Sequence, residues 1–168
     1  QPWPSMDQLE QLSGNAAGSF IIASTLVNFI EKGQSHLQDQ LEKALNMIDG
    51  LDLVYYQVIT MALEENKALS DRHLNIFHKV LAVLALVKEP LSITAISIIL
   101  QSKAHHIAHI LLGLQAILLI PENDDEPVKL FHTSLRDYLC TKAHSENLSI
   151  NLNQSHAMLA IKCLQVVV

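Results

Sequence analysis

His132 is the residue of this sequence whose type and position best suit a contact with a phosphate group. A short β-branched and apolar run, residues 128–131, precedes it, and an amphipathic helix is expected to follow. The spacing from Ser134 to Asp137 is that of a capping box, which predicts Ser134 as the helix N-cap. A helix N-terminus offers free backbone N–H groups and a positive dipole end, to which an imidazole can add a contact. The same position also suits an ordinary turn histidine, so the spacing by itself leaves both interpretations open.

Three other histidines, His105, His106 and His109, form the best candidate for a metal site. His105 and His109 would share one helical face, as the two histidines of zinc proteases do. However, the glutamate that those proteases place beside the first histidine is missing, and no third ligand is evident. We therefore expect no metal site here, and a polar edge of a helix is the simpler interpretation.

Other catalytic signatures are missing from the sequence. There is no glycine-rich phosphate-binding loop, no Gly-x-Ser-x-Gly elbow and no pair of carboxylates framed by apolar residues. Cys140 and Cys163 are isolated and typical of buried thiols, with a disulfide between them as the alternative. We expect this segment by itself to have no catalytic activity and to hold no cofactor.

The composition favours a packed helical protein. Hydrophobic residues make up 49% of the 168 residues and aromatic ones only 5%, so the aliphatic side chains must supply the core. The formal net charge is −6 with scattered lysines and arginines, which argues against a nucleic-acid partner. No apolar run reaches about 18 residues, so we expect no membrane span. Without a recognisable signal peptide, a cytoplasmic location is expected.

Helical periodicity predicts the elements that would position His132. Apolar residues recur at three- and four-residue steps, and the segments are bounded by capping residues, Gly or Pro. The small residues at 13–18 are expected to interrupt the helical structure. Gly33 is expected to end the second helix, and Ser35 is expected to cap the third. The stripe over residues 51–63 is the most continuous and is interpreted as core. The expected helices cover residues 5–12, 19–31, 37–48, 51–67, 70–87, 92–100, 104–118, 135–144 and 154–168.

Residues 118–120 and 128–131 are expected to pair as a small hairpin around an acidic turn at 121–127. Three helices followed by a two-stranded wing is the order of a winged-helix domain. The predicted fold is therefore mainly α: a helical, lid-like domain at 1–68, a winged-helix domain with trailing helix at 69–144, and the start of another helical segment at 145–168.

In a DNA-binding winged helix, the helix that reads the DNA would lie at 103–118. This segment holds one lysine and no arginine, and the wing is acidic, so both elements have the wrong charge for contacts with DNA phosphates.

Four segments in this order resemble the NACHT-type STAND ATPases, and most closely the fungal NLR-like proteins. The resemblance covers nearly the whole chain and implies the region after the nucleotide-binding core, so we expect the natural chain to be longer. The four segments are Leu12-Ser13 with 18–25 (GSFIIAST), 51–59 (LDLVYYQVI), 90–100 (PLSITAISIIL) and 131–139 (FHTSLRDYL).

The resemblance also implies a set of functional residues. Gly18 and Phe20 would occupy the element that packs over the adenine, with Phe20 where proline is usual. His132 matches the winged-helix histidine that touches the β-phosphate of ADP, known from the Met-His-Asp motif of plant resistance proteins. Phe131 and Thr133 stand in place of the Met and Asp of that motif. These contacts require the nucleotide-binding core.

The implied function is a regulatory, autoinhibitory segment of a signalling NTPase in innate-immunity-like or cell-death signalling. It would couple the ADP or ATP state to a domain rearrangement, and the parent protein would be the ATPase. The implied partners are its own nucleotide-binding core, a downstream repeat or sensor domain, and further copies in an active oligomer. The alternatives are a standalone helical protein–protein interaction module and a winged-helix DNA-binding domain.

Overall fold

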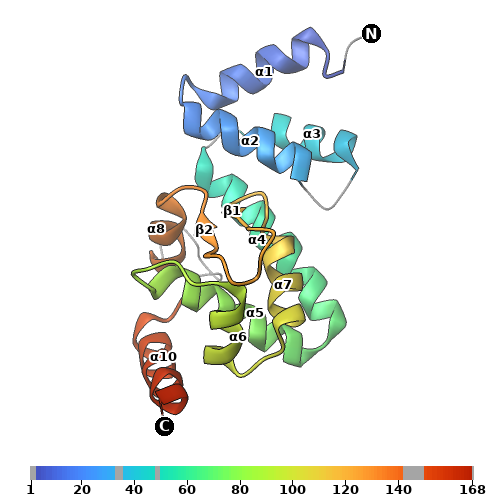
Figure 1. Cartoon of the computed structure of the whole chain (residues 1–168). Helices are drawn as coiled ribbons and strands as arrows, with labels where there is room; N and C mark the ends of the chain where they lie inside the picture. The colour runs from blue at the N-terminus through green and yellow to red at the C-terminus, as the bar shows by residue number, and fades with distance from the viewer. Residues whose placement is uncertain (1–2, 33–35, 48–49, 142–149, 168) are drawn as a thin grey trace.

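The protein is mainly helical, with one small antiparallel sheet (Figure 1). The computed structural model describes residues 3–32, 36–47, 50–141 and 150–167. The coarse fold prediction, mainly α with a two-stranded hairpin, is confirmed within these residues. Their elements are α1 (Met6–Ala16), α2 (Phe20–Lys32), α3 (Leu37–Leu45), α4 (Leu51–Leu69), α5 (Asp71–Leu86), α6 (Ile93–Leu100), α7 (Ala104–Gly113), β1 (Leu118–Leu119), β2 (Lys129–Leu130), α8 (Ser134–Cys140) and α10 (Leu152–Val167).

Helices α1, α2 and α3 lie together at one end of the molecule (Figure 1). α1 opens with a complete capping box, in which the Ser5 hydroxyl accepts from the Gln8 amide and the Gln8 side chain accepts from the Ser5 amide. The predicted interruption at 13–18 is wrong in its extent, because α1 continues through Gly14 to Ala16. The turn instead uses Ala17 at φ 48° and Gly18 at φ 76°, both left-handed. Gly33 and Ser35 lie outside the described residues, and the described N-cap of α3 is His36.

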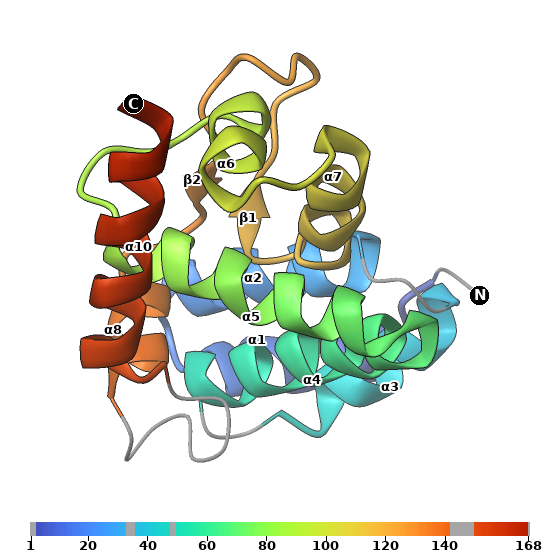
Figure 2. The ribbon, with the colours of Figure 1, turned by 90° about the horizontal axis from the view of Figure 1, so that it is seen from below.

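Helices α4 and α5 form the centre of the molecule. Figure 2 shows α5 between α4 on one side and α6, α7 and the hairpin on the other. α4 carries the predicted apolar stripe, whose buried members include Val54, Tyr55 and Ile59. α5 begins as predicted at Ser70, whose hydroxyl accepts from the His73 amide. It ends at Leu86, before Pro90. It has more buried residues than any other described helix.

Helices α6 and α7 lead into the hairpin. Ser92 caps α6 as predicted, with its hydroxyl accepting from the Ala95 amide. The prediction of a single helix over 104–118 is wrong, because α7 ends at Gly113. The chain then turns, and Leu118 pairs with Leu130 in the sheet instead. Gly113 has a low helix propensity, which weakens α7 at the point where it ends. The pairing of β1 with β2 then satisfies backbone hydrogen-bonding groups of the residues that follow.

The last two helices are α8 and α10. Ser134 is not the N-cap of α8, contrary to the prediction, because Thr133 already has helical angles (φ −64°, ψ −27°) and makes no side-chain cap. Ser134 is the first residue of the helix, and its hydroxyl bonds to two other side chains, described below. The described part of α8 ends at Cys140, and residues 142–149, including His144, lie outside the described residues. Both cysteines are free; Cys140 is half-buried, whereas Cys163 is exposed on α10, so the expectation of two buried thiols fails for Cys163.

One continuous hydrophobic core joins these elements. It runs from Leu26 of α2 through α4 and α5 to Leu139 of α8. The boundary predicted between residues 68 and 69 falls in the last turn of α4, which packs on both α2 and α5, and the division into domains stays a prediction. None of the described helices combines the length and the apolar character needed to cross a lipid bilayer.

Candidate functional site

His132 lies between β2 and α8, where the sequence placed it. The Phe131 amide donates to the Ile117 carbonyl at 3.0 Å and so extends the hairpin by one bond. The His132 carbonyl accepts from the Leu135 amide at 3.3 Å, in the first turn of α8. The imidazole is half-buried and is not part of the hydrophobic core. Its backbone is therefore held on both sides, while its ring keeps some access to solvent.

A chain of hydrogen bonds ties the His132 ring to α4. The Ser134 amide donates to His132 Nδ1 at 3.2 Å, and Ser134 Oγ lies 2.7 Å from the same nitrogen. The phenolic oxygen of Tyr55 lies 2.8 Å from Ser134 Oγ. Because a backbone N–H can only donate, Nδ1 must be the acceptor, which places the proton of the neutral ring on Nε2. Tyr55 then donates to Ser134, and Ser134 donates to His132.

Tyr55 is fixed in a form that can donate. Burial raises the pKa of its phenol above the usual value, the bond with Ser134 partly opposes this, and Asp52 adds to the rise. The Tyr55 ring packs against Tyr138 of α8, with centroids 5.4 Å apart and planes inclined at 58°. Both tyrosines are buried, so α4 holds the start of α8 by an aromatic contact as well as by the hydrogen bond.

This arrangement leaves Nε2–H of His132 as its remaining polar group. A ring whose Nδ1 is held by Ser134 cannot turn without losing those bonds. Such a ring presents one N–H donor in a fixed direction, which suits an anionic oxygen of a ligand. The sequence pattern missed Tyr55 and Ser134 in this role, because Tyr55 is 79 residues away from Ser134 in the chain.

Gly18 and Phe20 lie in a different place, at an apolar groove of about 450 Å³ between α1 and α2. The Phe20 side chain is 84% exposed, an unusual state for a large aromatic residue. Glycine suits position 18 because of its left-handed backbone (φ 76°) and not because of crowding, since an added Cβ would meet nothing within 4 Å. The apolar residues around them are Leu9, Leu12, Ala16, Ala23, Leu26, Val27 and Ile30.

Two of the three predicted site residues are thus brought together, and the third is not. Gly18 and Phe20 share the groove, but His132 does not line it. His132 is joined instead to α4, through Ser134 and Tyr55. Within the described residues the three therefore form two separate surfaces, and only a further partner could contact both at once.

The histidines of α7 are arranged differently from a metal site. Among the described residues, no group of three or more His, Cys, Asp or Glu side chains is placed to hold a metal ion. His105 and His106 contact each other, with ring centroids 4.3 Å apart, and His73 of α5 packs against His106 at 5.1 Å. His109 is exposed and shares no ring contact with them.

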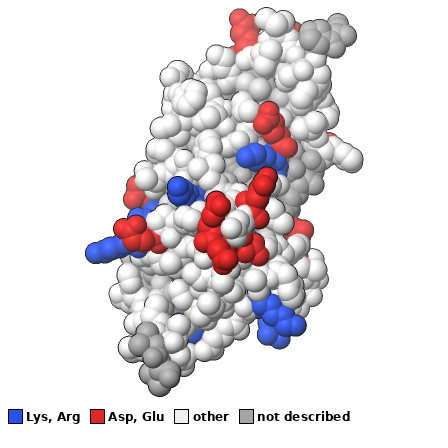
Figure 3. All heavy atoms as spheres, in the orientation of Figure 1, with Lys and Arg blue, Asp and Glu red and all other residues white. Residues whose placement is uncertain are grey.

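The connection between β1 and β2 carries a cluster of acidic side chains. Acidic side chains gather over it in the space-filling view (Figure 3). Glu122, Asp124, Asp125 and Glu126 are all exposed. Thr94 of α6 fixes this connection, with its amide donating to the Asp124 carbonyl at 3.1 Å and its hydroxyl to Asp125 Oδ1 at 2.7 Å. An acidic connection of this kind repels a phosphate backbone.

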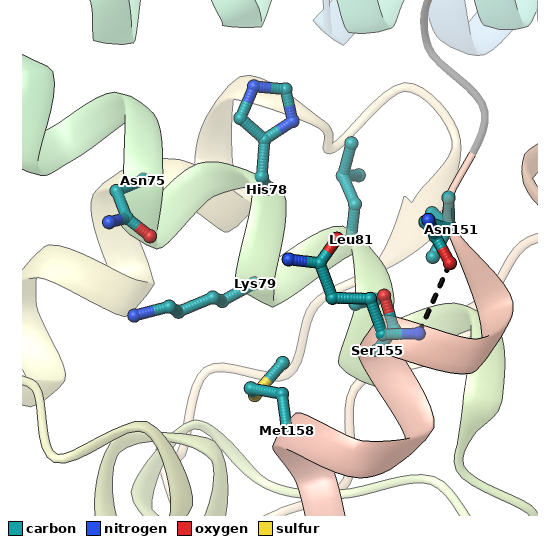
Figure 4. Close-up of a pocket in the computed structure, with 10 residues that line it drawn as sticks. Asn75, His78, Lys79, Leu81, Asn151, Ser155 and Met158 are labelled. Carbon is teal, nitrogen blue, oxygen red and sulfur yellow. Dashed lines mark hydrogen bonds between the residues drawn. The ribbon is translucent and has the colours of Figure 1, made fainter.

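A further cavity of about 310 Å³ lies between α5 and α10. Figure 4 shows His78 and Lys79 of α5 on one side and Met158 and Ser155 of α10 on the other, with the His78 ring turned away from Met158. The first turn of α10 is closed by Asn151, whose side chain accepts from the Gln154 amide at 3.1 Å.

Comparison of the chain with protein-family models, with curated proteins and with solved structures finds no match in any of the three. Its function must therefore be argued from its own residues.

Proposed function

We propose that this chain is a regulatory segment of a NACHT-type signalling NTPase, in which His132 senses a bound nucleotide. In this proposal α5, α6, α7 and the β1–β2 hairpin form a winged helix, and α1 to α4 form the lid-like part. The segment performs no chemistry itself. Its nucleotide-binding core supplies the ADP or ATP, and His132 adds one contact to a phosphate of ADP.

The observation that carries this proposal is the bonding of His132. Its Nδ1 is occupied by Ser134, so its Nε2–H is the group left to bind a phosphate oxygen. The half-buried ring is linked through Ser134 to the buried Tyr55, a tertiary contact that an ordinary turn histidine does not require. The groove with Phe20 and Gly18 adds support, because it leaves an apolar surface on which another domain can dock.

The mechanism is a shift between two arrangements. ADP that contacts both the core and His132 stabilises the closed arrangement by the strength of that extra contact. Exchange for ATP removes the contact and allows the winged helix to move away. A charge-assisted hydrogen bond of about 1.5–3 kcal/mol changes such an equilibrium by one to two orders of magnitude.

The test is the rate at which ADP leaves the full-length protein. His132→Leu removes the donor, so ADP should dissociate at least about tenfold faster and signalling should rise without a stimulus. His109→Leu is the matched control, because it makes the same exchange at an exposed histidine of α7 and should leave both unchanged. Equal ADP retention in the parent and in His132→Leu would show that the assignment is wrong.

A second candidate is a helical module that binds another protein through the α1–α2 groove. The exposure of Phe20 at 84% and of Val27 at 49% favours it specifically. The coding sequence before residue 1 separates the two candidates. A phosphate-binding loop encoded there supports the switch, whereas an unrelated domain there supports the interaction module. A DNA-binding role is disfavoured by the acidic side chains over the wing.

A further inference from the structure

A polar cavity of about 260 Å³ lies where α10 crosses the end of α6 and the first turns of α5. All the charged side chains that line it are cationic, namely Arg72 and Lys79 of α5 and Lys162 of α10. Three neutral polar residues complete its hydrophilic lining: Asn75, Gln101 and Ser102. This concentration of positive charge stands out in a chain whose net charge is −6.

The cations of this cavity have few protein partners. Lys162 Nζ donates to Gln101 Oε1 at 2.8 Å, which leaves two of its three N–H groups for another acceptor. Within the described residues, Arg72 and Lys79 make no hydrogen bond or ion pair. Like charges that converge on one hollow repel one another unless an anion lies between them.

The positive charge extends from the cavity to the start of α7. Lys103 is the N-cap of α7 and provides no side-chain cap, so the helix presents free N–H groups there. His106, in the first turn, has a buried Nδ1 without a hydrogen-bond partner among the described residues. Its pKa is lowered first by burial and then by His105, His73, Arg72 and Lys103. Arg72 therefore belongs both to the cavity and to this cluster.

We propose that this cavity is a binding site for a small polyphosphate anion, of which pyrophosphate is the simplest example. The arginine fork can hold two phosphate oxygens at once, and the two lysines supply compact charges beside it. The volume is below that of ordinary sites for drug-sized ligands, which are about 300–1,000 Å³, so the ligand is a small anion. Three cations match several negative charges better than one. The site is separate from His132 and does not depend on the proposed nucleotide switch.

The test is a titration of the ¹⁵N-labelled protein with inorganic pyrophosphate at constant ionic strength. Backbone amide signals of Arg72, Lys79, Ser102 and Lys162 should shift together and saturate. An exposed ion pair accounts for up to about a fivefold change in affinity, so Arg72→Gln combined with Lys79→Gln should weaken binding by about tenfold or more. Lys79→Arg, which keeps the charge, should bind like the parent.

Lys32→Gln is the matched control, because it removes one exposed positive charge from α2, in the layer at the other end of the molecule. It should leave the pyrophosphate affinity unchanged. Orthophosphate should bind several-fold more weakly than pyrophosphate, and equal binding would overturn the preference for a polyphosphate. The site itself is overturned if the shifts do not saturate, or if the double variant binds as tightly as the parent.

Discussion

Three side chains from two helices, Tyr55 of α4 and Ser134 and Tyr138 of α8, account for the behaviour expected of His132. The bond between Ser134 and Nδ1 fixes the position of the proton on the ring, and Tyr55 fixes Ser134. Tyr55 in turn is buried and packed on Tyr138. A change in any of these residues should therefore alter the ring of His132, even though only His132 would touch a ligand. Tyr55 and Ser134 are positioning residues in this account.

The first prediction concerns the tautomer of His132. Above the pH at which histidines are protonated, ¹⁵N NMR of the parent should show Nε2 protonated and Nδ1 unprotonated. Ser134→Ala removes the hydroxyl that lies 2.7 Å from Nδ1 but keeps the backbone amide that donates to it at 3.2 Å, so the Nδ1-protonated tautomer should gain population while the Nε2-protonated one stays the major form. Ser134→Thr keeps a hydroxyl and serves as the control. A parent spectrum with Nδ1 protonated would contradict the bonding described here.

A second prediction for a single residue concerns how the stability against unfolding depends on pH. The pKa of His106 is lower in the folded protein than the usual histidine value of 6.5, because of burial first and then of the neighbouring basic groups. Above that value the ring is neutral in both states, but as the pH falls through it the unfolded chain takes up a proton first. Stability against urea should therefore fall between about pH 7 and pH 5.

His106→Gln should reduce this loss of stability, because it removes one of the two described histidines whose pKa is lowered in the folded protein; His78 of α5, whose pKa is lowered by burial, is the other. His109→Gln, at an exposed site on the same helix, should leave the slope of stability against pH as it is in the parent. Identical slopes for the His106 variant and the parent would refute the attribution to His106.

At the scale of elements, α4 connects the parts of the fold. It packs on α2, α5, α7 and α8, and its Tyr55 reaches the turn that carries His132. Arg136 of α8 makes a similar link, because its Nη2 donates to the Val87 carbonyl at the end of α5 at 2.9 Å. A rearrangement of α8 against α4 and α5 must break these bonds, so the proposed switch would act at this junction.

Gln40 of α3 gives a prediction about how these elements pack. Its side chain is fully buried, and neither its Nε2 nor its Oε1 has a hydrogen-bond partner among the described residues. An unsatisfied buried amide costs about 1–3 kcal/mol, so Gln40→Met, which keeps the shape, should stabilise the protein by that order. The midpoint of thermal unfolding should rise by several degrees.

Gln38→Met, two residues earlier on the exposed face of α3, is the control: its amide is already bonded to Trp3 and Glu42, so this exchange should not stabilise the protein. If Gln40→Met lowers the unfolding midpoint instead, then the amide has a partner that this account lacks.

Much of the helical framework could be predicted from periodicity and caps, and the exceptions have physical causes. Ser70 and Ser92 cap helices as their local patterns predict, since a cap involves only neighbours along the chain. Ser134 has the same local pattern but bonds to Tyr55, a distant residue that no local pattern can identify. α7 stops at Gly113, because the pairing of Leu118 with Leu130 competes with the helical periodicity.

Part of the candidate site could likewise be predicted from the sequence, and part of it could not. The location of His132 at a strand–helix junction could be read from the sequence, because the change from an apolar run to an amphipathic pattern marks it. Its tautomer, its support by Tyr55 and its separation from the groove of Phe20 depend on tertiary packing. The basic cavity could not be predicted from the sequence either, because Arg72 and Lys162 come from helices far apart in the chain.

At the scale of the whole molecule, three surfaces face outward with different chemistry. The groove between α1 and α2 is apolar, the connection between β1 and β2 is acidic, and the cavity among α5, α6 and α10 is basic. His132 belongs to none of these surfaces and is held instead on α4. In the proposed switch, a nucleotide-binding core would cover the His132 junction and the apolar groove together, while the basic cavity would stay open to a separate anion.

The most direct test of the central claim is the structure of the full-length protein with ADP bound. The account predicts Nε2 of His132 about 2.7–3.2 Å from an oxygen of an ADP phosphate, with Nδ1 still bonded to Ser134. A structure in which ADP is bound and the His132 ring contacts no phosphate oxygen, directly or through one water, would contradict it.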